Sequence, residues 1–360
     1  MSEYKQSLYD FTQKELTALV KPSFRAKQIY GWIYHQYAQD FDTMKNIPKV
    51  MKEELQKKYL LNPLKIVRKE ESSDGTIKYL LQLQDNKTIE AVWLKMKDAQ
   101  IDTNGETIQE AKYTICVSTQ VGCKVGCSFC LTAKGGFTRD LTAGEIVAQV
   151  VTLKHDNNHK HNRKINIVYM GMGEPLDNLD NLAKAIEIFK EEEGLAISGK
   201  RQTVSTSGLS NKIDKLGAMD LGVHIAISLH AVDDKLRTEL IPMNRAHNIN
   251  SIIEAVKRFP IDTRKRVMFE YLVIKHKNDD LGSAKKLVKL LSGIKAKVNL
   301  IFFNPYPGTP YERPLREDMV KFQEYLINHG LFSTIRDSKG IDISAACGQL
   351  KEKNKDEINK

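Results

Sequence analysis

The stretch "CVSTQVGCKVGCSFC" (residues 116–130) contains four of the five cysteines in this chain of 360 residues. Three of them form a C-x3-C-x2-C motif: Cys123, Cys127 and Cys130. Cys116 lies seven residues before the motif, and the fifth cysteine, Cys347, lies near the other end of the chain. The motif indicates a bound group, and the two outlying cysteines need a separate explanation.

A motif of three cysteines is typical of a metal group that keeps one position open. Structural zinc sites and ferredoxin-type clusters normally take four protein ligands, whereas this loop supplies three. The spacing allows the loop to wrap one face of a [4Fe–4S] cluster, so that one iron stays free for a small molecule. Phe129 gives the loop an apolar wall. The alternative is a closed structural site with Cys116 as the fourth ligand, although Cys116 belongs to a strand pattern outside the loop.

The sequence after residue 113 alternates between strand and helix patterns. Six apolar segments predict strands: residues 113–119, 164–170, 201–207, 223–229, 267–274 and 297–303. Helical patterns lie between them, as at 141–156 and 178–194, and Thr142 and Glu145 form a capping box at the start of the first. This alternation predicts an α/β fold with a parallel sheet, either barrel-like or doubly wound, with ligands at the carboxyl ends of the strands.

Residues 1–95 predict a small accessory unit that is mainly helical. Residues 11–20 and 24–39 have helical spacing, and residues 76–96 predict two strands joined by a turn at 84–87. In the second helix, four side chains form the expected buried stripe: Phe24, Ile29, Trp32 and Ile33. Basic and aromatic side chains also alternate there: Arg25, Lys27 and His35 with Tyr30, Tyr34 and Tyr37. This mixture suits either RNA stacking or an amphipathic helix with a polar face.

The segment "HDNNHKHNRK" (155–164) contains three histidines between a predicted helix and a predicted strand. The histidines have no regular ligand spacing and no apolar neighbours in the sequence. We therefore expect a solvated loop there rather than a metal site.

Net charge and hydropathy narrow the class of protein. The chain has 55 basic and 45 acidic residues and a net charge of +10, which suits a polyanionic partner such as RNA or DNA. A proteome generally rich in lysine would give the same balance. The first residues carry charge and no apolar signal region, and no segment has the ~20 apolar residues needed to cross a bilayer. We expect a soluble, cytoplasmic protein without membrane contact, whose clustered cysteines serve metal binding or catalysis.

The cysteine motif, directly after the first predicted strand, resembles that of the radical S-adenosylmethionine (SAM) superfamily. The sequence "GMGEP" (171–175) follows the second strand, where the superfamily places a glycine-rich turn that contacts SAM. The resemblance implies a partial (β/α)6 barrel and a [4Fe–4S] cluster held by Cys123, Cys127 and Cys130. It also implies that SAM binds the open iron, where an electron cleaves it to methionine and a 5′-deoxyadenosyl radical.

Four stretches together resemble the RlmN/Cfr family of RNA adenine methyltransferases: "CVSTQVGCKVGCSFC", "GMGEPL", "FNPYPG" (303–308) and "GIDISAACGQL" (340–350). The likeness runs from about Phe24 to Leu350. It is closer to the RlmN branch, which methylates adenine C2, than to the Cfr branch, which methylates C8. It implies an N-terminal RNA-binding accessory domain at 1–95, a radical SAM core at 96–350 and a charged, disordered tail at 351–360.

The resemblance also implies substrates and partners. It predicts methylation of an adenosine at the peptidyl transferase centre of 23S ribosomal RNA and of the adenosine 3′ of the anticodon in tRNAs. An electron donor such as flavodoxin or ferredoxin would reduce the cluster, and the enzyme would act as a monomer. Two alternatives stay open at this point. One is a Cfr-like C8 methyltransferase of 23S rRNA that confers antibiotic resistance, and the other is a non-catalytic Fe–S or zinc protein that binds RNA.

The two outlying cysteines acquire roles from the same resemblance. Cys347 accepts a methyl group from a first SAM and becomes S-methylcysteine. The radical from a second SAM removes a hydrogen from that methyl group, and the resulting carbon radical adds to C2. Glu90 is implied as the acceptor of the C2 proton. Cys116 then attacks the sulfur of Cys347, which forms a transient disulfide and frees the methylated base.

The implied SAM contacts lie at the ends of predicted strands: Gly173, Glu174, Ser205, Ser228, Leu229, His230 and Asn304. Gly173 and Glu174 would contact the methionine moiety, because glycine lets the backbone approach closely and a carboxylate suits an ammonium group. The other residues would hold the ribose, carboxylate and adenine of SAM. For His230 the alternative is a histidine whose hydrogen bonds are satisfied within the protein.

Overall fold

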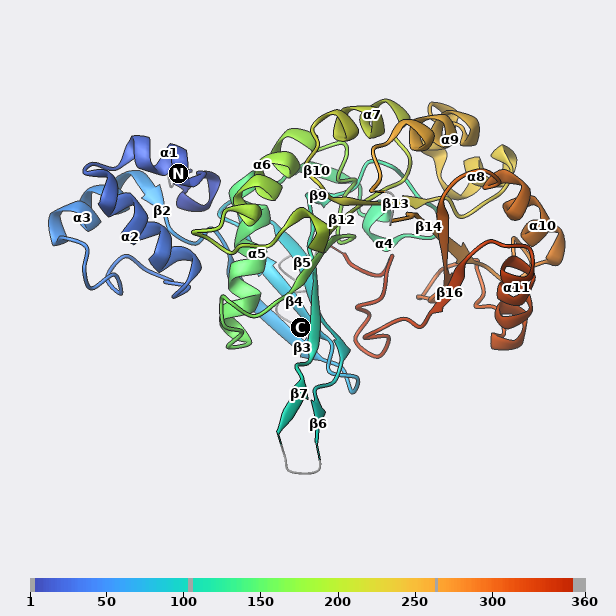
Figure 1. Cartoon of the computed structure of the whole chain (residues 1–360), viewed down its shortest axis with the longest axis horizontal. Helices are drawn as coiled ribbons and strands as arrows, with labels where there is room; N and C mark the ends of the chain where they lie inside the picture. Colours follow the sequence, from blue (N-terminus) through green and yellow to red (C-terminus); the bar gives the residue numbers. More distant parts are fainter. Residues whose placement is uncertain (1–3, 103–105, 263–264, 352–360) are drawn as a thin grey trace.

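One large sheet with helices on its outer face forms the body of the protein (Figure 1). The structure is a computed structural model that describes residues 4–102, 106–262 and 265–351. In these residues ten strands form the sheet, in the order β16-β15-β14-β13-β12-β11-β8-β5-β4-β3. The strands from β8 to β16 pair in parallel, and β3, β4 and β5 form an antiparallel extension at one edge.

The predicted alternation of strands and helices is confirmed. The parallel strands are β8 (Lys112–Cys116), β11 (Asn166–Tyr169), β12 (Gln202–Thr206), β13 (His224–Ser228), β14 (Val267–Val273), β15 (Ala296–Phe302) and β16 (Ser333–Arg336). The larger helices of this region are α5 (Ala143–Asp156), α6 (Leu179–Lys190), α7 (Ser210–Ala218), α8 (Asp234–Leu240), α9 (Ile249–Arg258), α10 (Leu281–Leu290) and α11 (Arg316–Asn328). Short 3₁₀ helices lie at Gly199–Arg201 and Pro242–Arg245.

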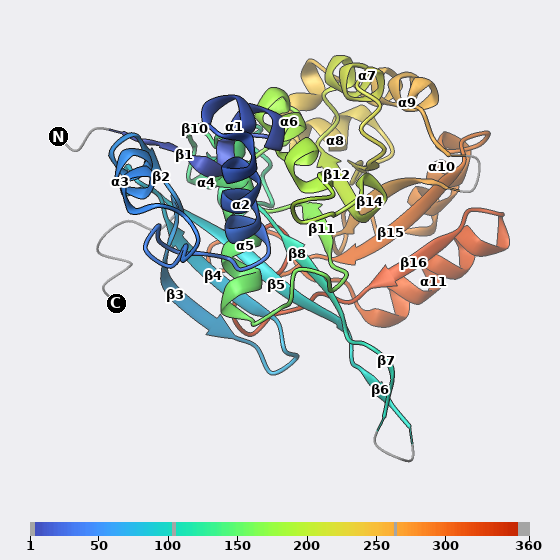
Figure 2. The same cartoon turned by 60° about the vertical axis from the view of Figure 1, so that its left-hand side comes forward.

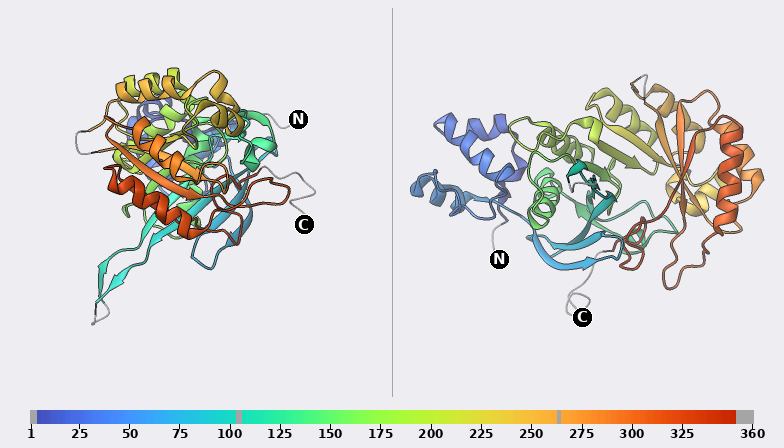
Figure 3. Two further views of the ribbon diagram at one scale, coloured as in Figure 1. Left: turned by 90° about the vertical axis from the view of Figure 1, so that its right-hand side faces the viewer. Right: turned by 60° about the horizontal axis from the view of Figure 1, so that its bottom comes forward.

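The parallel strands curve with the helices outside, which is the partial-barrel arrangement rather than the doubly wound one (Figure 3). Each of the six predicted strands is present, and β16 adds a further parallel strand that the sequence pattern does not predict. β16 has the short sequence "STIR", which lacks the apolar run of the other strands. Within the described part of the chain, no helix is long and apolar enough to cross a membrane.

Helix α5 joins the sheet to the N-terminal elements. Its predicted capping box is present: Thr142 Oγ1 accepts the N–H of Glu145 at 3.1 Å, and the Glu145 carboxylate accepts the N–H of Thr142 at 2.9 Å. The N–H of Gly144 in the first turn donates to the Asp10 carboxylate at 2.6 Å. Because the sheet and the N-terminal unit cover opposite sides of α5, nearly the whole helix is buried.

The N-terminal unit is mainly helical, as expected. It consists of β1 (Gln6–Ser7), a 3₁₀ helix (Leu8–Asp10), α1 (Gln13–Leu19), α2 (Ser23–Tyr34), α3 (Lys49–Lys58) and β2 (Tyr59–Leu60). The buried stripe predicted for α2 is confirmed at Ile29 and Ile33, and Trp32 is half-buried. It is wrong at Phe24, which is 52% exposed in the first turn, where its ring lies against the Arg25 guanidinium at 4.8 Å instead of in the core.

The three tyrosines of the predicted basic–aromatic mixture pack inside the protein, so they do not form a stacking surface for RNA. Tyr30, Tyr34 and Tyr37 are buried. The hydroxyl of Tyr30 donates to Glu191, and that of Tyr37 donates to the carbonyl of His159 at 3.0 Å. These side chains therefore attach the N-terminal unit to the parallel sheet and its helices.

The loop at 155–164 differs from the expected solvated loop at His159. This side chain is only 5% exposed and packs edge-on against Trp93 and Tyr113, with ring centroids at 5.3 and 5.8 Å. Burial lowers the pKa of His159 to about 4, so the ring is neutral near pH 7. Its aromatic partners come from distant strands, which is why the local sequence does not predict the burial.

The antiparallel extension consists of β3 (Lys65–Glu71), β4 (Ile77–Gln82) and β5 (Thr88–Lys97). The predicted turn at 84–87 joins β4 to β5. A hairpin of β6 (Gln100–Ile101) and β7 (Thr107–Gln109) projects from the body beyond β5 (Figure 2). Because β5 pairs with β8, the sheet continues across residue 95, and the domain division expected there stays a prediction. The tail predicted at 351–360 lies outside the described residues, apart from Lys351.

A buried arginine of α8 fixes the carboxyl ends of two central strands. Arg237 is fully buried and donates hydrogen bonds to the carbonyls of Ser228 and Leu229, each at 3.1 Å, and to the carbonyl of Ser207. It also donates to Asn244 Oδ1 at 2.8 Å. Burial lowers the pKa of Arg237 to about 10, so the side chain is still charged at neutral pH. The end of β13 and the loop after β12 are thus held by one side chain.

We predict that Arg237→Met destabilises the protein by about 3 kcal/mol or more, because several buried carbonyls lose their donor. Denaturant unfolding followed by circular dichroism measures the change. Arg258→Met is the control: Arg258 is exposed on α9 and pairs with Asp214 at 2.8 Å, so its loss should leave the midpoint nearly unchanged. Equal midpoints for wild type and Arg237→Met would contradict this role.

Candidate active site

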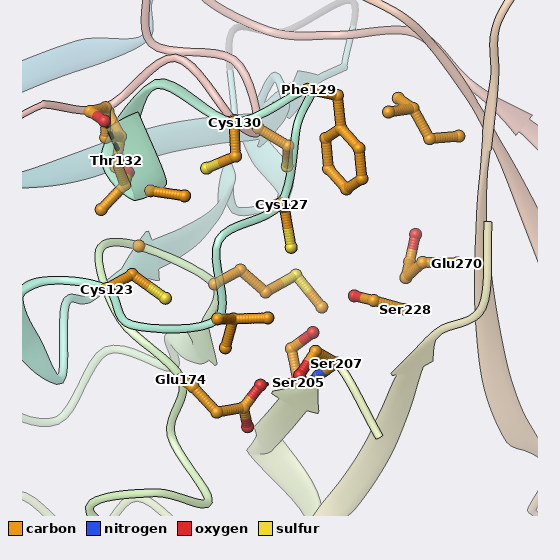
Figure 4. Close-up of a pocket in the computed structure, with 18 of the residues that line it drawn as sticks. Cys123, Cys127, Phe129, Cys130, Thr132, Glu174, Ser205, Ser207, Ser228 and Glu270 are labelled. Carbon is orange, nitrogen blue, oxygen red and sulfur yellow. Dashed lines mark hydrogen bonds between the residues drawn. The ribbon is translucent and has the colours of Figure 1, made fainter. Parts of the chain in front are cut away.

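A large cavity opens at the carboxyl ends of the parallel strands, beside the loop with the cysteine motif (Figure 4). Its volume is about 1070 Å³, open solvent at the mouth included. The three cysteines of the motif line one side, and residues at the ends of β11 to β15 line the other. The structure therefore brings the motif to the edge of the sheet where an α/β fold binds ligands.

The cysteine loop takes its shape from the protein chain around it. It begins after β9 (Gln120–Gly122), which pairs with β10 (Phe137–Asp140), and it ends at α4 (Leu131–Lys134). The N–H of Cys130 donates to the carbonyl of Cys127 at 3.2 Å, which forms a turn between these two residues. Both ends of the loop are thus anchored, and its middle is compact.

The chemistry of the three thiols suits an iron–sulfur cluster, because cysteine thiolates are the usual ligands of such clusters. Burial raises the pKa of Cys123 to about 12 and that of Cys127 well above its usual value, and the nearby Glu174 raises both further. A bound cationic group would reverse this tendency and favour the thiolates.

The "GMGEP" turn after β11 requires glycine at two positions. A Cβ at Gly171 would lie 2.7 Å from Ser118 Oγ, and a Cβ at Gly173 would lie 2.6 Å from Gln120 Cβ. Gly173 also has a φ of +104°, which L side chains rarely adopt. Both glycines line the cavity. The close contact with the strand behind them leaves room for a ligand in front of the turn.

Glu174 is buried at the base of the cavity (Figure 4). Its carboxylate accepts the N–H of Ser207 at 2.7 Å and the N–H of Leu176 at 3.1 Å. Burial raises the pKa of Glu174, while these backbone donors lower it. The carboxylate links the turn after β11 to the end of β12, and it presents negative charge to the cavity.

The structure brings most of the implied SAM contacts together. Five further residues in addition to Gly173 and Glu174 were implied, and four of them line the cavity: Ser205, Ser228, His230 and Asn304. Asn304 is oriented by Arg313, which donates to its Oδ1 at 2.8 Å. Leu229 does not line the cavity, because strand alternation directs its side chain into the hydrophobic core.

His230 is both held by the protein and exposed to the cavity. Its Nδ1 accepts the N–H of Leu272 at 3.0 Å, and burial lowers its pKa to about 3. The neutral ring therefore carries its proton on Nε2. Its edge packs against Phe129 of the cysteine loop, with ring centroids 5.1 Å apart. The two interpretations of His230 are thus compatible.

A second cavity lies next to the first and contains the fourth cysteine. Cys116, at the end of β8, lines only this second cavity, together with side chains of β5 and β16. Four residues line both cavities: Met170, Ile301, Cys347 and Leu350. Cys347 therefore lies in the wall between the cysteine-motif cavity and the cavity of Cys116. All five cysteines are free thiols in the structure.

The charge nearest to both outlying cysteines belongs to Arg336 of β16, which lines the second cavity. Burial raises the pKa of Cys116 to about 12, and proximity to Cys347 raises it further. Cys347 is exposed, yet partial loss of hydration around its thiol also raises the pKa of this residue. The guanidinium of Arg336 lowers the pKa of both thiols. It is the feature of this cavity that favours thiolates.

Glu90 lies near the two cavities but lines neither. It is 1% exposed on β5, two residues from Val92, which pairs with Cys116 in the sheet. Its carboxylate accepts the N–H of Lys351 at 2.8 Å and lies 3.7 Å from the ammonium of Lys78. Glu90 is thus next to the segment with Cys347, and that segment stands between its carboxylate and the cavities.

Two further polar side chains of the first cavity are not predicted by the sequence. Ser207 lies beside Glu174, and Glu270 Oε2 is buried with no hydrogen-bond partner among the described residues. Glu270 pairs with Ser228 and Asn299 across the sheet, and Asn299 donates to its other oxygen at 2.9 Å. A lone acidic residue inside the apolar strand at 267–274 is a signal that could have identified Glu270.

Two family models match the chain. Residues 117–288 match the radical SAM superfamily, and residues 6–61 match the ribosomal RNA large subunit methyltransferase N-terminal domain. The first match spans the cysteine motif and most of the parallel sheet. The second spans the N-terminal helices.

Relatives match almost the whole chain. The chain is 83% identical over 98% of its length to the dual-specificity RNA methyltransferase RlmN of Sulfurimonas denitrificans, and this covers 99% of that protein. It is 64% identical to the RlmN of Aliarcobacter butzleri, with 96% of each chain covered. Among solved structures, a radical SAM methyltransferase from Sphaerobacter thermophilus superimposes with a TM-score of 0.88 at 42% identity, covering 96% of this chain and 99% of that one. The chain belongs to the RlmN family within the radical SAM superfamily.

Proposed function

We propose that this protein is a radical SAM methyltransferase that methylates C2 of adenosine in 23S ribosomal RNA and in tRNA. The observation that carries the proposal is the position of Cys347 in the wall between two cavities. One cavity contains the cysteine motif and the glycine-rich turn, and the other contains Cys116. A thiol in this wall can accept a methyl group from one side and react with a second thiol on the other.

The first cavity has the residues to hold both cofactors. Cys123, Cys127 and Cys130 would hold a [4Fe–4S] cluster with one open iron. SAM would lie between that iron and the strand ends, where Gly173 admits the methionine backbone and Ser205 and Asn304 offer polar contacts. When bound, the cluster supplies the electron that cleaves SAM. Phe129 and Phe303 line the same cavity and limit the access of water to the cluster side.

Cys347 would accept the methyl group at its Sγ. An S–CH₃ bond forms, the methyl–sulfonium bond of SAM breaks, and the thiol proton leaves. Arg336 favours the thiolate form needed for this attack. The small residues Ala345 and Ala346 beside Cys347 leave space for an adenine to reach the methylated sulfur from the second cavity.

Release of the product would use the remaining two residues. Glu90 would accept the C2 proton, and this requires movement of the segment at 345–351 that covers its carboxylate. The thiolate of Cys116 would then attack the sulfur of Cys347, so that an S–S bond forms, the bond from that sulfur to the carbon on C2 breaks, and this carbon takes up a proton to become the methyl group. Both sulfur atoms line the second cavity, which is where the base would leave.

We infer further that the enzyme acts as a monomer in the cytoplasm and receives electrons from a flavodoxin or ferredoxin. Two observations support the compartment and the donor: free thiols suit a reducing compartment, and the open mouth of the cavity allows a reductant to approach the cluster. Gel filtration and reduction assays with purified donors test these points.

Deletion of the gene should remove 2-methyladenosine from 23S rRNA and tRNA, because this enzyme would be the one that forms it. Mass spectrometry of nucleosides from wild-type and deletion strains measures the change, with complementation as the control. Loss of 8-methyladenosine instead would favour the C8 alternative. Unchanged nucleosides would refute the proposed function.

Replacing Cys123, Cys127 or Cys130 with Ala should abolish iron binding and SAM cleavage, since each thiol would hold a different iron. Cys116→Ala should keep both, because Cys116 lines the other cavity. Iron per chain and 5′-deoxyadenosine after dithionite reduction are the measurements, made on anaerobically reconstituted protein. Loss of the cluster in Cys116→Ala would show that Cys116 is a fourth ligand.

Variants of the two outlying cysteines should stop the reaction at different steps. Cys347→Ala has no methyl acceptor, so it should form no covalent link to RNA. Cys116→Ala should accumulate a protein–RNA adduct, because only the thiolate attack that breaks the link is missing. Denaturing gels of protein expressed in cells, with and without ribonuclease, detect the adduct. An adduct in Cys347→Ala would exclude the assigned roles.

A further inference from the structure

Cys347 lies on a long segment, residues 338–351, here called the strap. The strap follows β16 and crosses to the antiparallel extension, where it contacts the turn between β3 and β4. Ser72 Oγ donates to the Asp342 carboxylate at 2.6 Å, and the N–H of Gly340 donates to the Asp74 carboxylate at 3.0 Å. The first part of the strap is thus attached to the antiparallel extension.

The last part of the strap contacts the cysteine loop. The N–H of Leu131 donates to the carbonyl of Gly348 at 2.8 Å, and Thr132 Oγ1 donates to the carbonyl of Leu350 at 2.6 Å. Cys347 therefore lies between two attachment points, one on the antiparallel extension and one at α4, where the cysteine loop ends. Its position depends on how firmly both are held.

A buried ion pair of the extension holds the strap on each side of Cys347. Lys78 of β4 is 4% exposed, and its ammonium donates to the carbonyl of Ile343 at 2.5 Å, four residues before Cys347. The same ammonium lies 3.7 Å from Glu90, which accepts the N–H of Lys351, four residues after Cys347. The pair of Lys78 and Glu90 thus contacts the strap four residues before and four residues after Cys347.

We propose that Lys78 is a positioning residue, which holds the strap so that Cys347 stays in the wall between the two cavities. The inference rests on the proposed function, because it gives the position of Cys347 a chemical purpose. Lys78 is too far from either cavity to line it, so it acts through the strap and through Glu90.

The cost of burying these charges supports a role in positioning. A buried ion pair seldom stabilises a fold more than apolar side chains of the same size would, because both ions lose their hydration. Here the ammonium faces two carboxylates, Glu90 at 3.7 Å and Glu70 at 3.3 Å, and one backbone carbonyl. An apolar residue could fill the space, but it could neither hold the Ile343 carbonyl nor balance the charge of Glu90.

The test is Lys78→Met, studied first without cofactors. Hydrogen exchange followed by mass spectrometry should show faster exchange in the strap peptide, with β11 to β14 unchanged. In reconstituted enzyme, methylation of Cys347 by SAM should slow by on the order of 10- to 100-fold, because displacement by about 1 Å costs that much. Lys78→Arg, which keeps the charge and the donor, should restore most of the rate.

Lys69→Met is the matched control. Lys69 belongs to the neighbouring strand β3 and forms an ion pair with Asp156 at 2.9 Å, away from the strap. In this variant, hydrogen exchange of the strap and the rate of Cys347 methylation should equal those of the wild type. Faster exchange spread equally over the whole sheet in Lys78→Met would contradict the proposal, since the residue would then serve general stability. The proposal would also be contradicted if the strap of Lys78→Met exchanged hydrogen like that of the wild type and Cys347 were methylated at the normal rate.

The experiment distinguishes failure of the proposed function from failure of the role proposed for Lys78. If wild-type Cys347 never gains a methyl group, the chemistry assigned to it is wrong. The exchange of the strap in Lys78→Met and Lys69→Met would still decide whether Lys78 holds it.

Discussion

One backbone hydrogen bond, from the N–H of Leu131 to the carbonyl of Gly348, joins the two halves of the candidate active site. Leu131 directly follows the last cysteine of the motif, and Gly348 directly follows Cys347. A bond of 2.8 Å between these two positions leaves the outlying thiol little freedom relative to the cysteine loop. The carboxyl ends of the strands, the cysteine loop and the chain near its end therefore form one site, although the loop and the chain near its end are more than 200 residues apart in sequence.

The shape of the first cavity comes mainly from the backbone. Gly171 and Gly173 contact the strand behind them, and Arg237 binds the carbonyls at the ends of two strands. These interactions leave the inward-facing side chains free to contact ligands. The electrostatics of the site are unusual, since burial raises the pKa of the thiols and few positive charges lie near them. Such a site is suited to a cationic group that arrives from outside, such as a metal cluster or a sulfonium compound.

The sequence predicted the parallel strands well, because buried strands are apolar on both faces and stand out as continuous runs. It also predicted the capping box of α5 and the meeting of the cysteine motif with "GMGEP" at one edge of the sheet. It did not predict β16 or the burial of His159, since both depend on partners from distant parts of the chain. The pairing of β5 with β8 is of the same kind, because periodicity predicts a strand but not its neighbours.

The position of Cys116 inside the sheet determines which sulfur atom can move. Cys116 pairs with Val92 on one side and with Val168 on the other, so its backbone is fixed by both neighbouring strands. In the proposed release step, Cys347 is therefore the residue that has to approach Cys116, across the second cavity that both line. The resulting disulfide would have to be reduced before Cys347 could accept another methyl group. Each catalytic cycle would thus need a reductant for the disulfide in addition to the electron for the cluster.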